Sequence, residues 1–132
     1  MAWANYPRGY RNKSKYGANK AVVDGITFDS RHEARRYSEL KLLERAGEIS
    51  DLELQVKFVL IPAQKEPDRI GSRGGLIKGK TIERECSYIA DFVYKDKSGV
   101  QVVEDAKGMK TEVYKIKRKL MLFVHGIQIK EV

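Results

Sequence analysis

Two runs of alternating apolar and polar residues, separated by a short turn sequence, constrain the fold of this 132-residue chain more than any other feature. The first run covers residues 88–94 and the second covers residues 100–106. Alternation with a period of two is typical of half-buried strands, and a three-residue loop that ends in a left-handed glycine, here Gly99, joins two such strands into a hairpin. We therefore predict a hairpin in which Asp91 lies opposite Asp105.

This predicted pairing brings two carboxylates and an ammonium group to one point. Directly opposed residues have Cβ atoms roughly 4.5–5.5 Å apart, so Asp91 and Asp105 would repel each other unless a cation lay between them. Mg²⁺ is commonly held by one or two carboxylates together with a substrate phosphate. Lys107 lies two residues beyond Asp105 and points the same way, where an ammonium can orient a water and offset charge on a phosphoryl group. Glu104 alternates onto the opposite face, which predicts either a structural role or a supporting role behind the metal ligands.

Asp91, followed after a short hairpin by Asp105-x-Lys107, resembles the PD-(D/E)XK nuclease superfamily, with Ala90 where the family often has proline. Residues 30–58 and 110–132 extend this resemblance to a small phage-encoded nuclease family that is similar to phage Holliday-junction resolvases of the endonuclease I type. The resemblance implies an α/β fold: a restriction-endonuclease-like core with a mixed central β-sheet flanked by α-helices. It also implies a Mg²⁺-dependent DNA endonuclease, with Mn²⁺ able to substitute, that acts on branched or four-way DNA as a homodimer.

Glu33 has two interpretations. Residues 30–33, Ser-Arg-His-Glu, form a capping box at the start of a helix predicted from Ser30 to Ala46, and spacing alone favours this structural role. The resemblance instead implies an acidic metal ligand on the helix that precedes the sheet. On that interpretation Glu33 joins Asp91 and Asp105 as a ligand, and Lys107 completes the catalytic set.

The chain carries 26 Lys and Arg against 18 Asp and Glu, a net charge of +8, which indicates an anionic partner such as a nucleic-acid backbone. Its length suits one domain over residues 21–132, preceded by a basic, flexible arm over residues 1–20. A single cysteine, Cys86, argues against a disulfide framework or a Cys/His zinc site. We see no membrane-spanning stretch and no secretion signal, so we expect a phage- or prophage-encoded protein in the bacterial cytoplasm.

Basic residues concentrate in two places where DNA contact is predicted. The first is the N-terminal arm, which is either a solvated terminus or an arm that binds phosphates and stacks on bases. The second is a helix predicted from Thr111 to His125, whose N-terminal amides are suited to a phosphate. The predicted DNA-binding residues are Arg8, Arg11, Lys13, Lys15, Lys110, Thr111, Lys115, Lys117, Arg118 and Lys119. The apolar stripe of this helix, predicted to be core, is Val113, Ile116, Leu120, Phe123 and Val124.

The remaining segments leave alternatives open. Residues 51–62 alternate as a long strand, on which Gln55 and Lys57 either border the catalytic groove or belong to an ordinary exposed face. Residues 63–81 predict a mobile loop, which either enters a DNA groove or is a tolerated insertion. An Asp24-Gly25 turn predicts a short hairpin, and residues 127–132 predict a last short strand.

These observations favour a metal-dependent DNA endonuclease, because carboxylates repel phosphate unless a cation intervenes. The alternatives are a non-catalytic DNA-binding protein and an RNA-directed nuclease or a nuclease subunit of a larger recombination complex.

Overall fold

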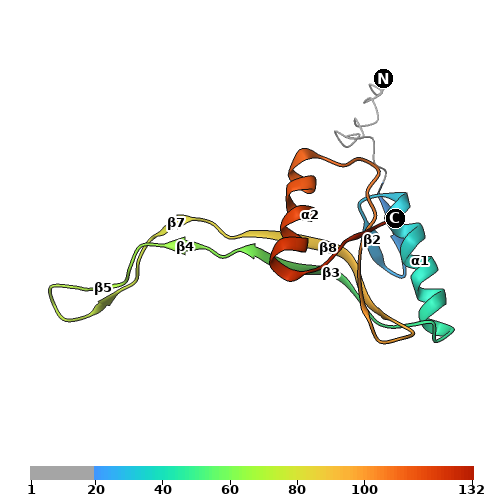
Figure 1. Ribbon diagram of the computed structural model, residues 1–132, viewed down its shortest axis with the longest axis horizontal. Coiled ribbons are helices and arrows are strands. Elements are labelled where there is room, and N and C mark those ends of the chain that lie inside the picture. The colour runs from blue at the N-terminus through green and yellow to red at the C-terminus, as the bar shows by residue number, and fades with distance from the viewer. Residues whose placement is uncertain (1–19) are drawn as a thin grey trace, which may run out of the picture.

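A mixed four-stranded sheet forms the centre of the protein in a computed structural model that describes residues 20–132. The strand order is β10 (Lys130–Glu131), β9 (Gln101–Asp105), β8 (Cys86–Asp96) and β3 (Ile49–Ile61). β10 is parallel to β9 and the other pairs are antiparallel, so the predicted α/β class with a mixed sheet is confirmed. Two helices, α1 (Arg31–Arg45) and α2 (Glu112–His125), pack against this sheet (Figure 1). Neither is long and apolar enough to cross a membrane.

The β8–β9 hairpin has the predicted register. Phe92 pairs with Glu104, and the Asp96 amide donates a 2.9 Å hydrogen bond to the Val100 carbonyl. Gly99 has a φ of 83°, which is the left-handed conformation that the loop requires. The paired residues keep one antiparallel register along the hairpin. When this register is continued by one residue beyond Phe92 and Glu104, Asp91 lies opposite Asp105.

Helix α1 (Arg31–Arg45) forms because Ser30 caps it and three apolar side chains recur on one face. These residues, Ala34, Tyr37 and Leu40, are buried against the sheet. The predicted hairpin before the helix is present as β1 (Ala21–Val23) and β2 (Ile26–Phe28), and its turn residues Asp24 and Gly25 both have positive φ.

Helix α2 (Glu112–His125) begins and ends where predicted, with a hydrogen bond from the Tyr114 amide to Thr111 Oγ1 and a left-handed Gly126 at its end. Its predicted core stripe was wrong. The helix buries Tyr114 and Met121, while Leu120 is half-buried and the other four predicted core residues are exposed. The reason is that the helix is apolar on more than one face, and packing against Tyr88 on the sheet selects the face that carries Tyr114.

The segment predicted as a loop, residues 63–81, is instead part of a two-stranded arm between β3 and β8. β4 (Gln64–Lys65) pairs with β7 (Thr81–Glu83), and β5 (Arg69–Ile70) pairs with β6 (Leu76–Ile77). The arm projects away from both helices (Figure 1). Its strands have no alternation in the sequence because their side chains are exposed on both faces, so no core selects a period of two.

Candidate active site

Asp91 reaches across the hairpin to the end of β9. The Ala106 amide donates a 2.8 Å hydrogen bond to Asp91 Oδ2, and Gln55 Nε2 lies 3.4 Å from Asp91 Oδ1. Burial raises the pKa of Asp91, the Ala106 hydrogen bond lowers it, and the charge of Asp105 raises it further. The two carboxylates that the sequence predicted to converge therefore influence each other.

Asp105 is 1% exposed, and its two oxygens have different surroundings. The Tyr88 hydroxyl donates a 2.5 Å hydrogen bond to Oδ2. Oδ1 is buried without a hydrogen-bond partner among the described residues, and Lys107 Nζ lies 3.6 Å away. The same ammonium is 5.1 Å from the centre of the Tyr114 ring. Asp105 thus presents one oxygen that has a countercharge nearby but, among the described residues, no hydrogen-bond donor.

Glu33 combines part of the capping role with proximity to this cluster. Its amide donates to Ser30 Oγ over 3.1 Å, as a capping box requires, but within residues 20–132 its carboxylate returns no hydrogen bond to Ser30. Burial, followed by the charges of Asp91 and Asp29, raises the pKa of Glu33 to about 7, although the charge of Lys107 opposes this shift. The carboxylate therefore lies within the electrostatic reach of Asp91 and Lys107.

These four residues do not by themselves form a complete metal cage. Within the part of the chain that the structure describes, no group of three His, Cys, Asp or Glu side chains is arranged to hold a metal ion. The donor chemistry nevertheless fits a hard cation, because the partnerless Asp105 Oδ1 and the weakly bonded Asp91 Oδ1 are both carboxylate oxygens. Asp91 and Asp105 are thus the two residues suited to a divalent cation, with Glu33 beside them.

Glu104 has the structural role that the alternation predicted. It is fully buried, and Arg36 donates to both of its oxygens over 2.9 and 2.6 Å while the Tyr94 hydroxyl adds a 2.6 Å bond. Burial alone would raise the pKa of Glu104, but these hydrogen bonds outweigh it and lower the pKa. Glu104 therefore anchors α1 to β9 from the core.

Two further residues belong to the site. Gln55, which the sequence left open, contacts Asp91 and has a φ of 53°, a left-handed conformation that is costly inside a strand for a residue other than glycine. Tyr88 was not predicted, because an aromatic residue in an alternating strand has the pattern of a core side chain. No signal in the sequence distinguishes its hydroxyl from that of Tyr94.

The predicted DNA-binding residues differ in what surrounds them. Arg8, Arg11, Lys13 and Lys15 lie outside the described residues. Lys110 and Arg118 both pair with Glu131, over 2.6 and 2.8 Å, and Lys115 pairs with Glu112. In residues 20–132, Lys117 and Lys119 are in no ion pair, so they carry the less compensated charge on α2. Thr111 is occupied as the helix cap.

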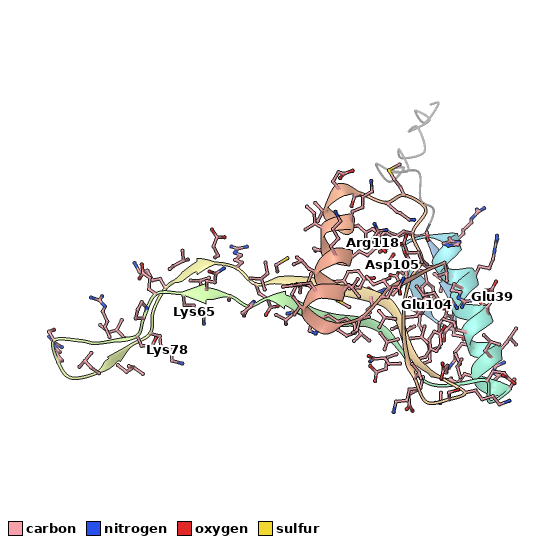
Figure 2. All side chains as sticks on the ribbon, in the orientation of Figure 1. Glu39, Lys65, Lys78, Glu104, Asp105 and Arg118 are labelled. Carbon is pink, nitrogen blue, oxygen red and sulfur yellow. The ribbon has the colours of Figure 1, made fainter. Side chains whose placement is uncertain are left out.

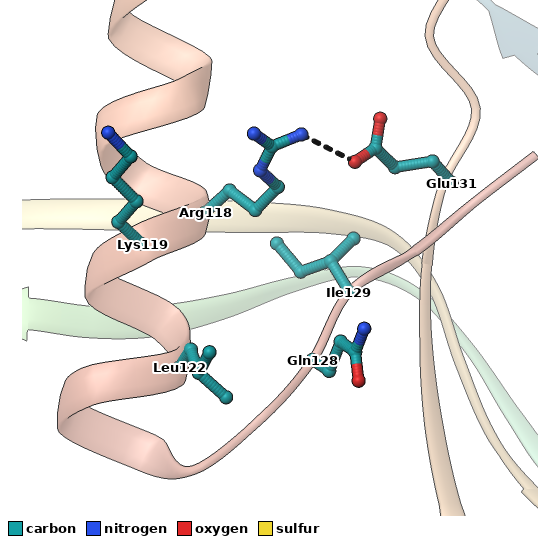
Figure 3. Close-up of a pocket in the computed structure, with 6 residues that line it drawn as sticks. All are labelled: Arg118, Lys119, Leu122, Gln128, Ile129 and Glu131. Atoms are coloured by element: carbon teal, nitrogen blue, oxygen red, sulfur yellow. Dashed lines mark hydrogen bonds and ion pairs between the residues drawn. The ribbon is translucent and has the colours of Figure 1, made fainter.

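A shallow hollow of about 250 Å³ lies between α2 and the C-terminal strand (Figure 3). Arg118, Lys119 and Glu131 line its polar side, and the Arg118 guanidinium points to Glu131. Neither Asp91 nor Asp105 lines this hollow, so the candidate active site lies apart from it.

The fold and site define an α/β protein whose central hairpin carries an acidic pair and a lysine. The chain matches the family described as "Protein of unknown function (DUF1064)" over residues 13–130, and it belongs to that family. Comparison with curated proteins and with solved structures found no match.

Proposed function

We propose that this protein is a metal-dependent DNA endonuclease with a restriction-endonuclease-like core, and that its substrate is branched DNA such as a four-way junction. The observation that carries the proposal is the convergence of Asp91, Asp105 and Lys107, with one buried Asp105 oxygen lacking a donor. A module that only bound DNA would gain nothing from burying a carboxylate beside the phosphate-binding surface.

Each residue has a separate task in this proposal. Asp91 and Asp105 hold a divalent cation, Mg²⁺ or Mn²⁺, which when bound supplies a nucleophilic water and polarises the phosphoryl oxygen. The Ala106 amide and Tyr88 fix the orientation of the two carboxylates. Lys107 orients the attacking water and offsets negative charge in the transition state. Glu33 accepts a proton or approaches the cation from α1.

Cutting both strands of a junction calls for two sites, which a two-fold homodimer supplies most simply. The exposed face of α2 supports this part of the proposal. Val113, Ile116, Leu120 and Phe123 recur at spacings of three, four and three, the heptad pattern by which a helix packs against a like helix. Val113, Ile116 and Phe123 are 62%, 58% and 88% exposed, so a second copy of the chain would cover three apolar side chains that the fold leaves open beside the half-buried Leu120.

The test is cleavage of linear duplex, single-stranded, flap and four-way DNA, each with Mg²⁺, Mn²⁺ or EDTA. We expect metal-dependent cuts at the junction. In Asp105→Asn the cleavage rate should fall by about 100-fold or more, which is the order of magnitude for removing one group that stabilises the transition state. Asp51→Asn is the matched control, because Asp51 is an exposed aspartate of β3. Its backbone is left-handed, a conformation that asparagine also adopts readily.

Two results would redirect the proposal. Metal-independent binding to every DNA without a cut under any condition would favour the non-catalytic DNA-binding protein. Cleavage of RNA alone, or activity only with added recombination proteins, would favour the RNA-directed nuclease or the subunit of a larger complex.

A further inference from the structure

The arm formed by residues 62–85 is a distinct surface that the candidate active site does not use. Among the described residues, its strands pair only with one another, β4 with β7 and β5 with β6. Each side of the arm runs for about a dozen residues, so at roughly 3.3 Å per residue it extends about 40 Å from the sheet. That length exceeds one helical turn of duplex DNA, about 34 Å.

The distal part of the arm has charge of one sign. Residues 69–80, here called the tip, contain four basic residues and no acidic residue, whereas the acidic residues of the arm lie nearer the sheet. No tip side chain forms an ion pair within the part of the chain that the structure describes. Figure 2 shows Lys78 of the tip and Lys65 of the proximal arm far from the acidic cluster of the core. The basic residues of the tip are Arg69, Arg73, Lys78 and Lys80.

The tip also exposes an apolar pair. Ile70 pairs directly with Leu76 across β5 and β6, and these side chains are 71% and 63% exposed. A cross-strand aliphatic pair stabilises a ribbon by at most about 1 kcal/mol, and this pair leaves most of its apolar surface in water. In the major groove of DNA, apolar side chains can contact thymine methyl groups while neighbouring cations hold the phosphates.

The join between the two ribbons of the arm has a fixed close-packed geometry. A Cβ atom on Gly79 would lie 1.6 Å from the Glu66 carbonyl oxygen, so only glycine can occupy this position. The Gly79 amide donates to Asp68 Oδ1, and the Glu66 amide donates to the Lys80 carbonyl, both over 2.8 Å. A merely tolerated insertion would not require the two strands to approach so closely at this point.

We propose that the tip is a DNA-binding β-ribbon that places its cations on phosphates and the Ile70–Leu76 pair against the bases of a groove, about one helical turn from the cleavage site. The inference rests on the proposed nuclease function and narrows its substrate to DNA with a duplex segment beside the cut. A two-stranded ribbon fits the major groove, which is about 12 Å wide. Charge complementarity selects DNA over a second copy, because two tips of like charge repel.

The experiment measures DNA affinity by fluorescence anisotropy with Ca²⁺ in place of Mg²⁺, over a range of salt concentrations. The probes are a long duplex, and four-way junctions with either long arms or arms of about half a helical turn. Lys78→Gln/Lys80→Gln removes two charges from the tip. Its matched control, Lys95→Gln/Lys97→Gln, removes two exposed charges at the opposite end of β8.

We expect the tip variant to bind long-armed DNA about 10-fold more weakly, with the salt slope reduced by about two, while the control changes affinity by less than about threefold. On short-armed junctions the wild type and the tip variant should bind alike. Ile70→Ser/Leu76→Ser should lower affinity for long-armed DNA without changing the salt slope.

Equal affinity and salt slope of the tip variant and the wild type on long-armed DNA would overturn the inference. So would a tip variant whose sedimentation changes while its salt slope does not, because the tip would then bind another copy of the chain. These measurements need no cleavage, so they are independent of the nuclease test. If Asp105→Asn stops cleavage but the tip variant binds DNA like the wild type, only the inference about the tip fails. If the tip variant binds DNA more weakly but the wild type cuts no DNA, only the nuclease proposal fails.

Discussion

The Tyr88 hydroxyl lies 2.5 Å from Asp105 Oδ2 in a region of the core that solvent scarcely reaches. Burial raises the pKa of Tyr88, and the hydrogen bond to Asp105 raises it further, so the phenol remains a donor at every physiological pH. Within residues 20–132, this hydroxyl is the one hydrogen-bond donor to the buried Asp105 carboxylate.

Tyr88→Phe should therefore leave Asp105 without a hydroxyl partner and lower the free energy of unfolding in EDTA by about 1–3 kcal/mol. The melting temperature should fall by roughly 3–10 °C, and Mg²⁺ should restore part of the loss by neutralising the carboxylate. Circular dichroism melts with and without Mg²⁺ measure both effects. Tyr94→Phe is the control, because Glu104 keeps two hydrogen bonds from Arg36. Identical melting of Tyr88→Phe and the wild type in EDTA would contradict the assigned contact.

Glu33 should make metal-free stability depend on pH. With a pKa of about 7 in the folded state against an ordinary 4.5, the folded protein retains a proton that the unfolded chain releases. The free energy of unfolding therefore falls as the pH rises from about 4.5 to 7, by about 1–2 kcal/mol once solvent screening of this half-buried group is allowed for.

Glu33→Gln should remove this contribution, so that in EDTA it is as stable as the wild type near pH 4.5 and more stable near about pH 8. Urea unfolding across this range provides the measurement. Ser30→Ala serves as the control, since losing the helix cap should lower stability by about 1 kcal/mol at every pH. A Glu33→Gln curve parallel to that of the wild type would return Glu33 to a purely structural role.

Gln55 should show a conflict between stability and activity. Its left-handed backbone costs about 1 kcal/mol, which Gln55→Gly should recover while removing the amide beside Asp91. We expect a more stable protein that cleaves junction DNA about tenfold more slowly. Asparagine tolerates this conformation but its side chain is one methylene shorter than that of glutamine. Gln55→Asn should therefore have a stability and a cleavage rate between those of the wild type and Gln55→Gly. Destabilisation by glycine would show that the backbone here is not strained.

Phe123 should report the oligomeric state. Phe123→Glu places a charge at the most exposed residue of the α2 stripe, so a homodimer of the 15.1 kDa chain should become a monomer in analytical ultracentrifugation. Junction cleavage should change from paired cuts to single nicks. Leu42→Glu, at an exposed leucine of α1, is the control and should remain dimeric. A wild-type protein that is monomeric at all concentrations would refute the dimer.

The hairpin could be predicted from the sequence because its determinants are local. Gly99 fixes the loop and the alternation fixes which residues oppose each other, so the pairing of Phe92 with Glu104 follows from a few neighbouring residues. The same argument explains why the cap by Ser30 and the turn at Gly25 were predicted correctly.

The features that could not be predicted from the sequence depend on contacts between residues that are far apart along the chain. Met121 rather than Phe123 is buried on α2 because the sheet selects one of several apolar faces. The contact of Arg36 with Glu104 joins residues 68 positions apart, and it depends on how α1 docks on β9. The arm was missed because its pairing follows backbone hydrogen bonds that no pattern of buried side chains records.

Gly79 and its neighbours also bear on how the chain folds. β3 and β8 are far apart in sequence, and closing the loop between them costs conformational entropy before their side chains pack. The short pairs of the arm lie within that loop, so hydrogen bonds near Gly79 can form first and bring Ile61 close to Cys86. A substitution at Gly79 should therefore slow refolding as well as redirect the tip, because the central pair of the sheet would have to find its register without this local guide.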